Sequence, residues 1–274
     1  MADNRPIGVF DSGLGGLTVV RELKKILKNE SIVYFGDTAR VPYGNRSAQT
    51  VCRYAKEDEH FLLTKNVKMI IAACGTVSSV AGAAAKGLPV PYFEMVTPAA
   101  EAAVAQTKNQ KIGVIGTAAT VNSKAHAKKI LSLLPTAQIT AVSCPLFVPL
   151  VEAGWIQKGD PVTTATVARY LQPLRQAGVD TLIMGCTHYP AIAETIAAYM
   201  GPGVQLINMG TPVAKKVDRF LQQHGLGATA PATYRYYVTD RMDSFSSIAA
   251  VLLGENIEDR VQTIELNQLT EEQP

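Results

Sequence analysis

Two stretches of this chain share one form: a short apolar run, a cysteine, a threonine and then a helix-like segment. Residues 69–73 precede Cys74 and Thr76, and residues 181–184 precede Cys186 and a second threonine. Such apolar runs are typical of buried parallel strands. Each cysteine therefore lies in a strand-to-helix turn, where open α/β sheets bind ligands and where a helix N-terminus favours a thiolate. This predicts an active site with a thiol on each of two sides.

A second repeat supports this interpretation. Ile7 and Ile112 each open an Ile-Gly-Val strand, at similar distances before Cys74 and Cys186. Chance similarity between common strand sequences is the alternative. Because order and spacing both agree, we favour two related α/β units.

The remaining pattern alternates strands with helices, which predicts mainly parallel sheets. Strands are expected at 5–10, 31–35, 69–73, 90–94, 111–117, 137–144, 181–184, 204–208 and 234–238. Helices are expected at 17–27, 49–65, 98–106, 161–176, 191–200, 211–224 and 244–253. Residues 36–44 and 145–154 are expected to be loops, and the polar tail from Thr270 to be frayed.

Composition excludes several classes of protein. The chain has 274 residues, 47% of them hydrophobic, and a net charge of +3, which predicts a full core and no disorder. No interleaved basic and aromatic patch indicates nucleic-acid binding. No signal peptide or membrane span is expected. The glycine-rich turn at 11–16 does not match the nucleotide-binding spacings, although it could bring Asp11 and Ser12 to a small anion.

The other cysteines and histidines are expected to be structural. The four cysteines form no CxxC pair, which predicts reduced thiols in the cytoplasm and neither disulfides nor a zinc site. Cys52 and Cys144 are interpreted as structural residues. We expect His60, His126 and His224, which lie in helical stretches, at the surface.

Two thiols that flank a ligand permit inversion at a carbon. One group removes a proton from one face and the other delivers a proton to the opposite face. Asp11 and His188 are candidates to assist these transfers. A nucleophilic hydrolase that uses Cys186 with His188 remains an alternative at this point.

The motifs resemble those of the glutamate racemases of the aspartate/glutamate racemase superfamily. The matching stretches are 7–18, 36–38, 42–44, 73–76, 113–117, 144–146, 151–152 and 185–190. This resemblance implies a cofactor-independent, metal-free racemase that interconverts L- and D-glutamate. It also implies a cytoplasmic and dimeric enzyme that supplies D-glutamate for peptidoglycan synthesis and hence for cell-wall biogenesis and cell shape.

The implied fold has two pseudo-symmetric three-layer α/β domains with mainly parallel sheets that face each other across a cleft. Residues 1–97 with 211–274 would form the first domain, and residues 98–210 the second. The active site would lie between them.

The resemblance also implies the roles of individual residues. Cys74 would exchange the α-proton of D-glutamate, assisted by Asp11. Cys186 would exchange that of L-glutamate, assisted by His188 and Glu152. The residues implied to hold the amino acid are Asp11, Ser12, Pro42, Tyr43, Gly44, Gly75, Thr76, Thr117, Thr120, Thr187 and His188.

One position departs from the family. Where the family has Cys-Asn-Thr, this chain has Cys74, Gly75 and Thr76. An asparagine side chain both donates and accepts hydrogen bonds, and Gly75 offers only its backbone. Ser78, Ser79 or a water could replace the missing amide.

Two other functions remain open. The first is a racemase, isomerase or decarboxylase of the same architecture with another substrate such as aspartate. The second is a binding protein on this fold. The presence of both cysteines favours racemisation over a one-cysteine decarboxylase, and Asp11 with His188 argues against a non-catalytic protein.

Overall fold

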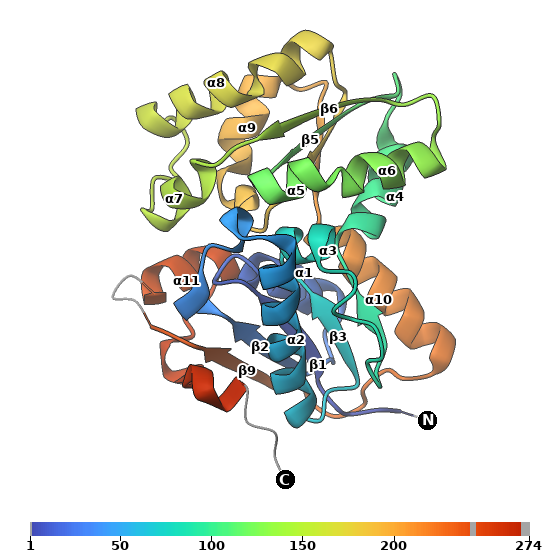
Figure 1. The fold of residues 1–274 in the computed structure, drawn as a ribbon, viewed down its shortest axis with the longest axis vertical. Coiled ribbons are helices and arrows are strands. Elements are labelled where there is room, and N and C mark those ends of the chain that lie inside the picture. Colours follow the sequence, from blue (N-terminus) through green and yellow to red (C-terminus); the bar gives the residue numbers. More distant parts are fainter. Residues whose placement is uncertain (1, 242–244, 270–274) are drawn as a thin grey trace.

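A computed structural model describes residues 2–241 and 245–269, and within them the strands form two sheets (Figure 1). The six-stranded sheet has the order β10-β9-β2-β1-β3-β4. Its strands are β1 (Ile7–Asp11), β2 (Ile32–Gly36), β3 (Met69–Ala72), β4 (Tyr92–Phe93), β9 (Tyr234–Val238) and β10 (Val261–Thr263). The four-stranded sheet has the order β6-β5-β7-β8. Its strands are β5 (Lys111–Gly116), β6 (Gln138–Ser143), β7 (Thr181–Met184) and β8 (Gln205–Asn208).

The two sheets repeat one arrangement. Every strand pair in the described residues is parallel, and β2-β1-β3-β4 has the same order as β6-β5-β7-β8. Ile7 pairs with Met69 as Ile112 pairs with Thr181. Cys74 and Cys186 therefore follow equivalent strands, as the repeat in the sequence predicted.

Helices cover both faces of the sheets, which gives each unit three layers (Figure 1). They are α1 (Leu17–Ile26), α2 (Ala48–Thr64), α3 (Gly75–Val80), α4 (Val96–Gln106), α5 (Ala118–Ser123), α6 (Ala125–Leu133), α7 (Phe147–Glu152), α8 (Pro161–Ala177), α9 (Ala193–Met200), α10 (Gly210–His224) and α11 (Phe245–Leu253). Short 3-10 helices lie at Thr38–Arg40, Tyr43–Asn45, Tyr189–Ile192, Glu258–Arg260 and Leu266–Leu269. The expected fold class is confirmed: two α/β domains with parallel sheets.

Both faces of the six-stranded sheet are buried, which explains its continuous apolar strands. Val9 and Ile71 belong to the core cluster that contains α1, while Phe10 and Ile70 belong to the cluster that contains α2. Successive side chains of a strand thus point into different layers.

The helix ends follow local rules. The Ser47 hydroxyl accepts from the Thr50 N–H at 3.2 Å at the start of α2, and Asp160 accepts from the Thr163 N–H at 2.8 Å at the start of α8. Helix α8 ends at Gly178, whose φ of 67° is the left-handed conformation that glycine adopts without strain.

Two sequence interpretations are wrong. Residues 145–154 were expected to form a loop, but they contain α7; Pro149 is its third residue, where a helix needs no backbone N–H. His126 was expected at the surface, but it is 3% exposed in α6 and shares its buried face with Ile130. His60 and His224 are exposed, as expected.

Some expectations are not tested. The expected helix start at Ser244 and the tail from Thr270 lie outside the described residues. The sheets draw on residues 7–93 with 234–263 and on residues 111–208; the domain boundaries at 97/98 and 210/211 stay a prediction. No helix in the described ranges is both long and apolar enough to cross a bilayer.

Candidate active site

A cavity of about 310 Å³ lies where strand-end loops of the two sheets meet. Both predicted thiols line it, Cys74 after β3 and Cys186 after β7. Its lining comprises Ser12, Val41, Pro42, Tyr43, Gly44, Asn45, Cys74, Thr76, Thr117, Ala118, Cys144, Pro145, Val148, Pro149, Glu152, Cys186, His188 and Tyr189. The fold thus brings the two cysteines, far apart in the sequence, to one pocket.

On one side of the pocket, Cys74 is a protonated thiol. It is 4% exposed, and its Sγ donates to the Ser12 hydroxyl at 3.5 Å. Burial, with the nearby Asp11 carboxylate as a second cause, raises the pKa of Cys74 to about 12. The expectation that the helix start would lower this pKa is therefore wrong for Cys74, because burial and a like charge outweigh the helix.

Asp11 lies near this thiol but outside the described lining of the pocket, and it is fully buried. Its Oδ2 accepts from the N–H groups of Gly13 at 3.2 Å and Gly16 at 3.0 Å, within the glycine-rich turn. Burial raises the pKa of Asp11, while the charge of His188 and these N–H groups oppose the rise. Asp11 therefore lies close enough to both Cys74 and His188 for its charge to act on each of them.

On the other side, Cys186 and His188 form a polar chain that ends at Glu152. The Cys186 Sγ lies 3.9 Å from His188 Nδ1, and His188 Nε2 lies 3.1 Å from Glu152 Oε1. Burial alone would lower the pKa of His188, but the contacts with Cys186 and Glu152 raise it to about 10. At neutral pH the imidazole is therefore a cation beside the Cys186 sulfur, where it stabilises negative charge.

Hydrogen bonds tie the two halves together around the pocket. The Thr18 hydroxyl of α1 donates to the Thr187 carbonyl at 2.8 Å, and the Thr187 hydroxyl donates to Asp11 at 3.5 Å. The hydroxyls of Thr76 and Thr117 lie 3.0 Å apart. Polar groups of one half thus satisfy those of the other.

A buried ionic cluster holds the loop after β2 against the pocket. Arg40 donates to Asp37 at 2.6 Å and to Asp58 at 3.2 Å, and it also contacts Glu57. The Tyr43 hydroxyl donates to Asp37 and lies 3.1 Å from Asp58. Because its hydroxyl is engaged there, Tyr43 contributes its ring and backbone to the pocket wall.

Ten of the predicted site residues line the pocket, and four lie outside its described lining. Asp11, Gly75, Thr120 and Thr187 are these four; each is buried, and all except Gly75 are hydrogen-bonded to residues of the site through their side chains. Ser78 and Ser79, considered as replacements for the missing asparagine, donate instead to the carbonyls of Ala72 and Gly75.

Sequence reasoning missed part of the wall. The additional lining residues are Val41, Asn45, Ala118, Cys144, Pro145, Val148, Pro149 and Tyr189. Three of them, Pro145, Val148 and Pro149, belong to residues 145–154, where a loop was expected. Cys144 is fully buried, and burial raises its pKa, so a protonated third thiol lies in the wall.

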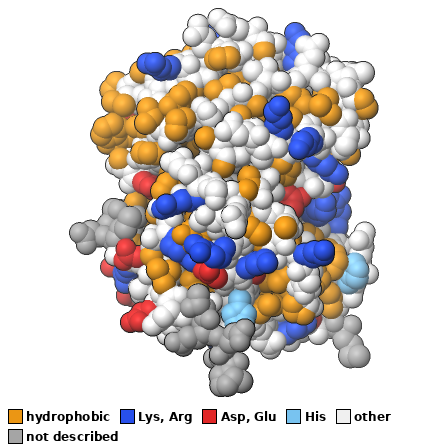
Figure 2. Space-filling model, in the orientation of Figure 1, with side chains coloured by type: hydrophobic (Ala, Val, Ile, Leu, Met, Phe, Trp, Pro, Cys, Tyr) orange, Lys and Arg blue, Asp and Glu red, His pale blue; other side chains and the backbone are white. Residues whose placement is uncertain are grey.

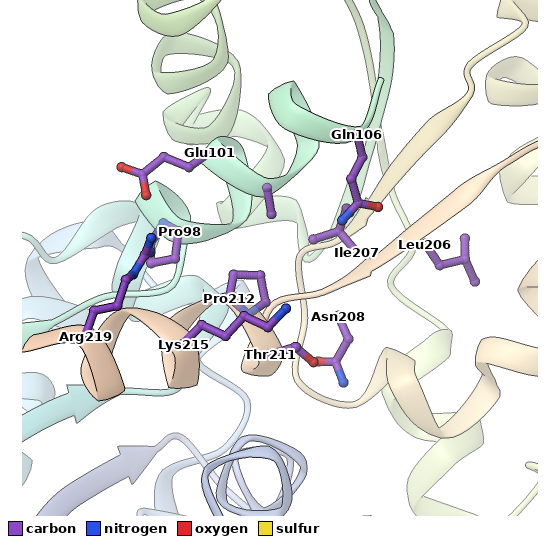
Figure 3. Close-up of a pocket in the computed structure, with 11 residues that line it drawn as sticks. Pro98, Glu101, Gln106, Leu206, Ile207, Asn208, Thr211, Pro212, Lys215 and Arg219 are labelled. Atoms are coloured by element: carbon purple, nitrogen blue, oxygen red, sulfur yellow. The ribbon is translucent and has the colours of Figure 1, made fainter. Parts of the chain in front are cut away.

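A second cavity, of about 390 Å³, lies between α4, β8 and α10 (Figure 3). Lys215 and Arg219 extend from α10, and Glu101 and Gln106 from α4. Its described lining contains neither cysteine nor histidine. Acid–base chemistry with two thiols therefore belongs to the first cavity, although the second is larger.

Hydrophobic side chains gather over α7 and α8 at the upper left of Figure 2. Exposed apolar residues of this region are Leu146, Trp155 and Val162.

In the described ranges no group of three or more His, Cys, Asp or Glu side chains could hold a metal ion.

Two equivalent α/β units each present one thiol to a shared pocket. This arrangement defines the class of protein: a two-domain α/β protein with a two-cysteine site suited to proton transfer. Comparison with known proteins agrees. A sequence model of the Asp/Glu/Hydantoin racemase family matches residues 7–217. The glutamate racemase of Syntrophus aciditrophicus is 44% identical over 255 residues, which cover 92% of this chain and 94% of the relative.

Solved structures match over nearly the whole chain. The glutamate racemase of Francisella tularensis, in complex with D-glutamate, has a TM-score of 0.88 at 36% identity and covers 97% of this chain and 99% of its own. A glutamate racemase isoform of Bacillus anthracis has a TM-score of 0.91 at 35% identity, with 96% and 98% coverage. The chain belongs to the Asp/Glu/Hydantoin racemase family.

Proposed function

We propose that this protein is a cofactor-independent racemase that interconverts L- and D-glutamate. The observation that carries the proposal is the pair of thiols, Cys74 and Cys186, which reach one pocket from equivalent strand ends. Relatives that are named glutamate racemases and cover this chain almost completely support glutamate as the substrate.

The reaction needs one base and one acid on opposite faces of the α-carbon. From L-glutamate, the Cys186 thiolate takes the α-proton, and the electron pair of the broken C–H bond stays on the α-carbon. The Cys74 thiol then gives its own proton to the opposite face of this carbon. The reverse reaction exchanges these roles. The raised pKa of Cys74, about 12, suits a group that delivers a proton, and the His188 cation suits the side on which a thiolate forms.

The carbanion-like state requires donors in a site that excludes water. The pocket is bordered by strand-end loops whose side chains supply hydroxyls at Ser12, Thr76 and Thr117. These groups are proposed to hold the amino and carboxyl groups of the substrate, together with backbone N–H groups of the adjoining turns. Gly75 supplies no side chain to this set.

The test is α-proton exchange in deuterated buffer, followed by NMR with L- and D-glutamate and then with aspartate. Deuterium incorporation with inversion of glutamate alone supports the proposal. Inversion of aspartate alone would instead assign the alternative substrate. Binding without exchange would indicate a non-catalytic protein.

Variants separate the two thiols. Cys74→Ala and Cys186→Ala are expected to abolish racemisation of both enantiomers, whereas Cys52→Ser, a change in α2 outside the pocket, serves as the control. Full activity in either alanine variant would refute the two-base mechanism.

We further infer a cytoplasmic homodimer that supplies D-glutamate for peptidoglycan, with domains at 1–97 plus 211–274 and at 98–210. The exposed apolar side chains of Leu146, Trp155 and Val162 provide surface that favours association. Sedimentation analysis tests the dimer, and depletion of the protein in its host with rescue by D-glutamate tests the role.

A further inference from the structure

Three glycines of the first unit touch the second unit at points where no side chain fits. Gly15, Gly44 and Gly75 follow β1, β2 and β3, and each is buried. Gly15 lies in a turn, Gly44 in the 3-10 helix Tyr43–Asn45, and Gly75 at the start of α3. A Cβ atom on Gly75 would lie 2.2 Å from the Gly185 carbonyl oxygen. A Cβ on Gly15 would lie 2.3 Å from the Thr187 Oγ1, and one on Gly44 would lie 2.8 Å from the Thr117 Cβ.

These contacts surround the reacting groups. Gly75 follows Cys74 directly, and Gly185 precedes Cys186, so the Gly75–Gly185 contact joins the two cysteine turns backbone to backbone. The Gly15 contact lies beside His188, whose Nδ1 would be 2.5 Å from the added Cβ. The two halves therefore approach each other closely where the thiols are held.

We propose that Gly15, Gly44 and Gly75 are positioning residues that set the separation of Cys74 and Cys186. Because these residues have no side chain, the backbones of the two halves can come into contact. Gly75 matters most, because the atom that it meets is a carbonyl oxygen of a turn and cannot swing away like the end of a side chain. Only the catalytic test of this inference depends on the proposed racemase function; the test of thiol spacing does not.

The structure indicates the size of the effect. An alanine at position 75 requires the Gly185 carbonyl to retreat by more than about 1 Å to reach an ordinary van der Waals separation. A displacement of that size at reacting groups costs about 100-fold in rate.

The first test measures the spacing of the thiols without any turnover. Bifunctional methanethiosulfonates of graded length are reacted with the intact protein, and peptide mapping identifies which reagent bridges Cys74 and Cys186. Gly75→Ala and Gly44→Ala should shift the bridging to longer reagents. Gly82→Ala, where the added Cβ meets nothing within 4 Å, is the matched control and should not.

A second control separates spacing from general instability. Gly8→Ala crowds Leu62 and Val67 at 3.1 Å, so the nearest atoms to the added Cβ all belong to the first unit. It should lower thermal stability but leave the bridging reagent unchanged. If Gly75→Ala does not yield folded protein, Gly44→Ala decides the question, since the atoms it meets belong to a threonine side chain.

The catalytic readout is the ratio of α-deuterium exchange to inversion with D-glutamate. Cys74 takes the α-proton of D-glutamate, and the thiol formed exchanges this proton for a deuteron of the solvent. When Cys186 is displaced, the Cys74 thiol returns this deuteron to the carbanion on the same face, so the original enantiomer reappears with deuterium. Inversion in Gly75→Ala should fall about 100-fold, and exchange should fall less.

The proposal would be overturned if Cys74 and Cys186 were bridged by reagents of unchanged length in both Gly75→Ala and Gly44→Ala. It would also be overturned if the bridging length in Gly8→Ala increased as much as in these variants. Lack of racemisation in the unmodified protein would refute the proposed function but not the spacing result, because bridging needs no substrate.

Discussion

Arg40 provides the sharpest test of how the pocket wall is held. Its side chain is 13% exposed, and the guanidinium faces Asp37 and Asp58, whose side chains are fully buried, as well as the partly buried Glu57. Burial and the charge of Asp37 already raise the pKa of Asp58. Arg40→Met therefore leaves carboxylates buried without their cation.

Removing one partner of a buried ionic group costs about 3–5 kcal/mol of unfolding free energy. In urea denaturation, the midpoint of Arg40→Met should fall by about 1 M or more. Arg40→Lys keeps the charge but loses the planar fork, so an intermediate loss is expected. The exposed Arg46→Met, in the same segment, is the matched control.

The same variant should weaken substrate binding, because the Tyr43 hydroxyl shares this cluster and Tyr43 lines the pocket. The KM for glutamate is expected to rise.

If Arg40→Met lowers the free energy of unfolding by less than about 1 kcal/mol, the size found for exposed ion pairs, the cluster is not held by Arg40.

Three further perturbations have definite signs. Glu152→Gln removes a contact that raises the pKa of His188 against burial, so the alkaline limb of the L-to-D rate profile should move down by roughly one pH unit; an unmoved limb would exclude this pairing. Burial lowers the pKa of His126 from 6.5 to about 4. The His126 imidazole of the unfolded chain therefore binds a proton more tightly than that of the folded chain, and the free energy of unfolding falls by about 3 kcal/mol as the pH falls from 6.5 to 4. His126→Leu should abolish that loss in urea titrations at pH 4 and pH 7. Thr18→Val leaves the Thr187 carbonyl without its donor and should cost about 1–3 kcal/mol by chemical denaturation, whereas a neutral result would mean that a water replaces the hydroxyl.

All strands of the described residues except β10 were predicted, because most of them are continuous apolar runs, and the two cysteine turns were predicted because these runs end in the same pattern. Tyr234–Val238 was expected to be the last strand, but the short edge strand β10 follows it. Residues 145–154 were misread because two prolines and a glycine suggested a loop. Pro149 instead occupies the first turn of α7, where a missing N–H costs nothing. Helices α5 and α6 received no prediction, and the burial of His126 depends on its face of α6 rather than on its residue type.

The sequence named individual candidate residues, ten of which line the pocket, but it did not show which of the candidates face the cavity and which lie behind its wall. Sequence motifs cannot tell that Asp11 lies behind the pocket or that the Tyr43 hydroxyl points away from it, since both facts depend on contacts with distant segments. The reason for a glycine at position 75 likewise lies outside its own turn. It is the carbonyl oxygen of Gly185, a residue of the other sheet.

The pairing of β2 with β9 has a consequence for synthesis on the ribosome. Ile32 is placed beside Tyr234, with the complete four-stranded sheet between them in the chain. As the chain emerges, the strands from Lys111 to Asn208 are all present while the first sheet still lacks its edge. All strands of the four-stranded sheet are therefore available before the six-stranded sheet can be completed. Until the C-terminal segment arrives, β2 has no partner on one side, and an unpaired strand edge of this kind favours aggregation.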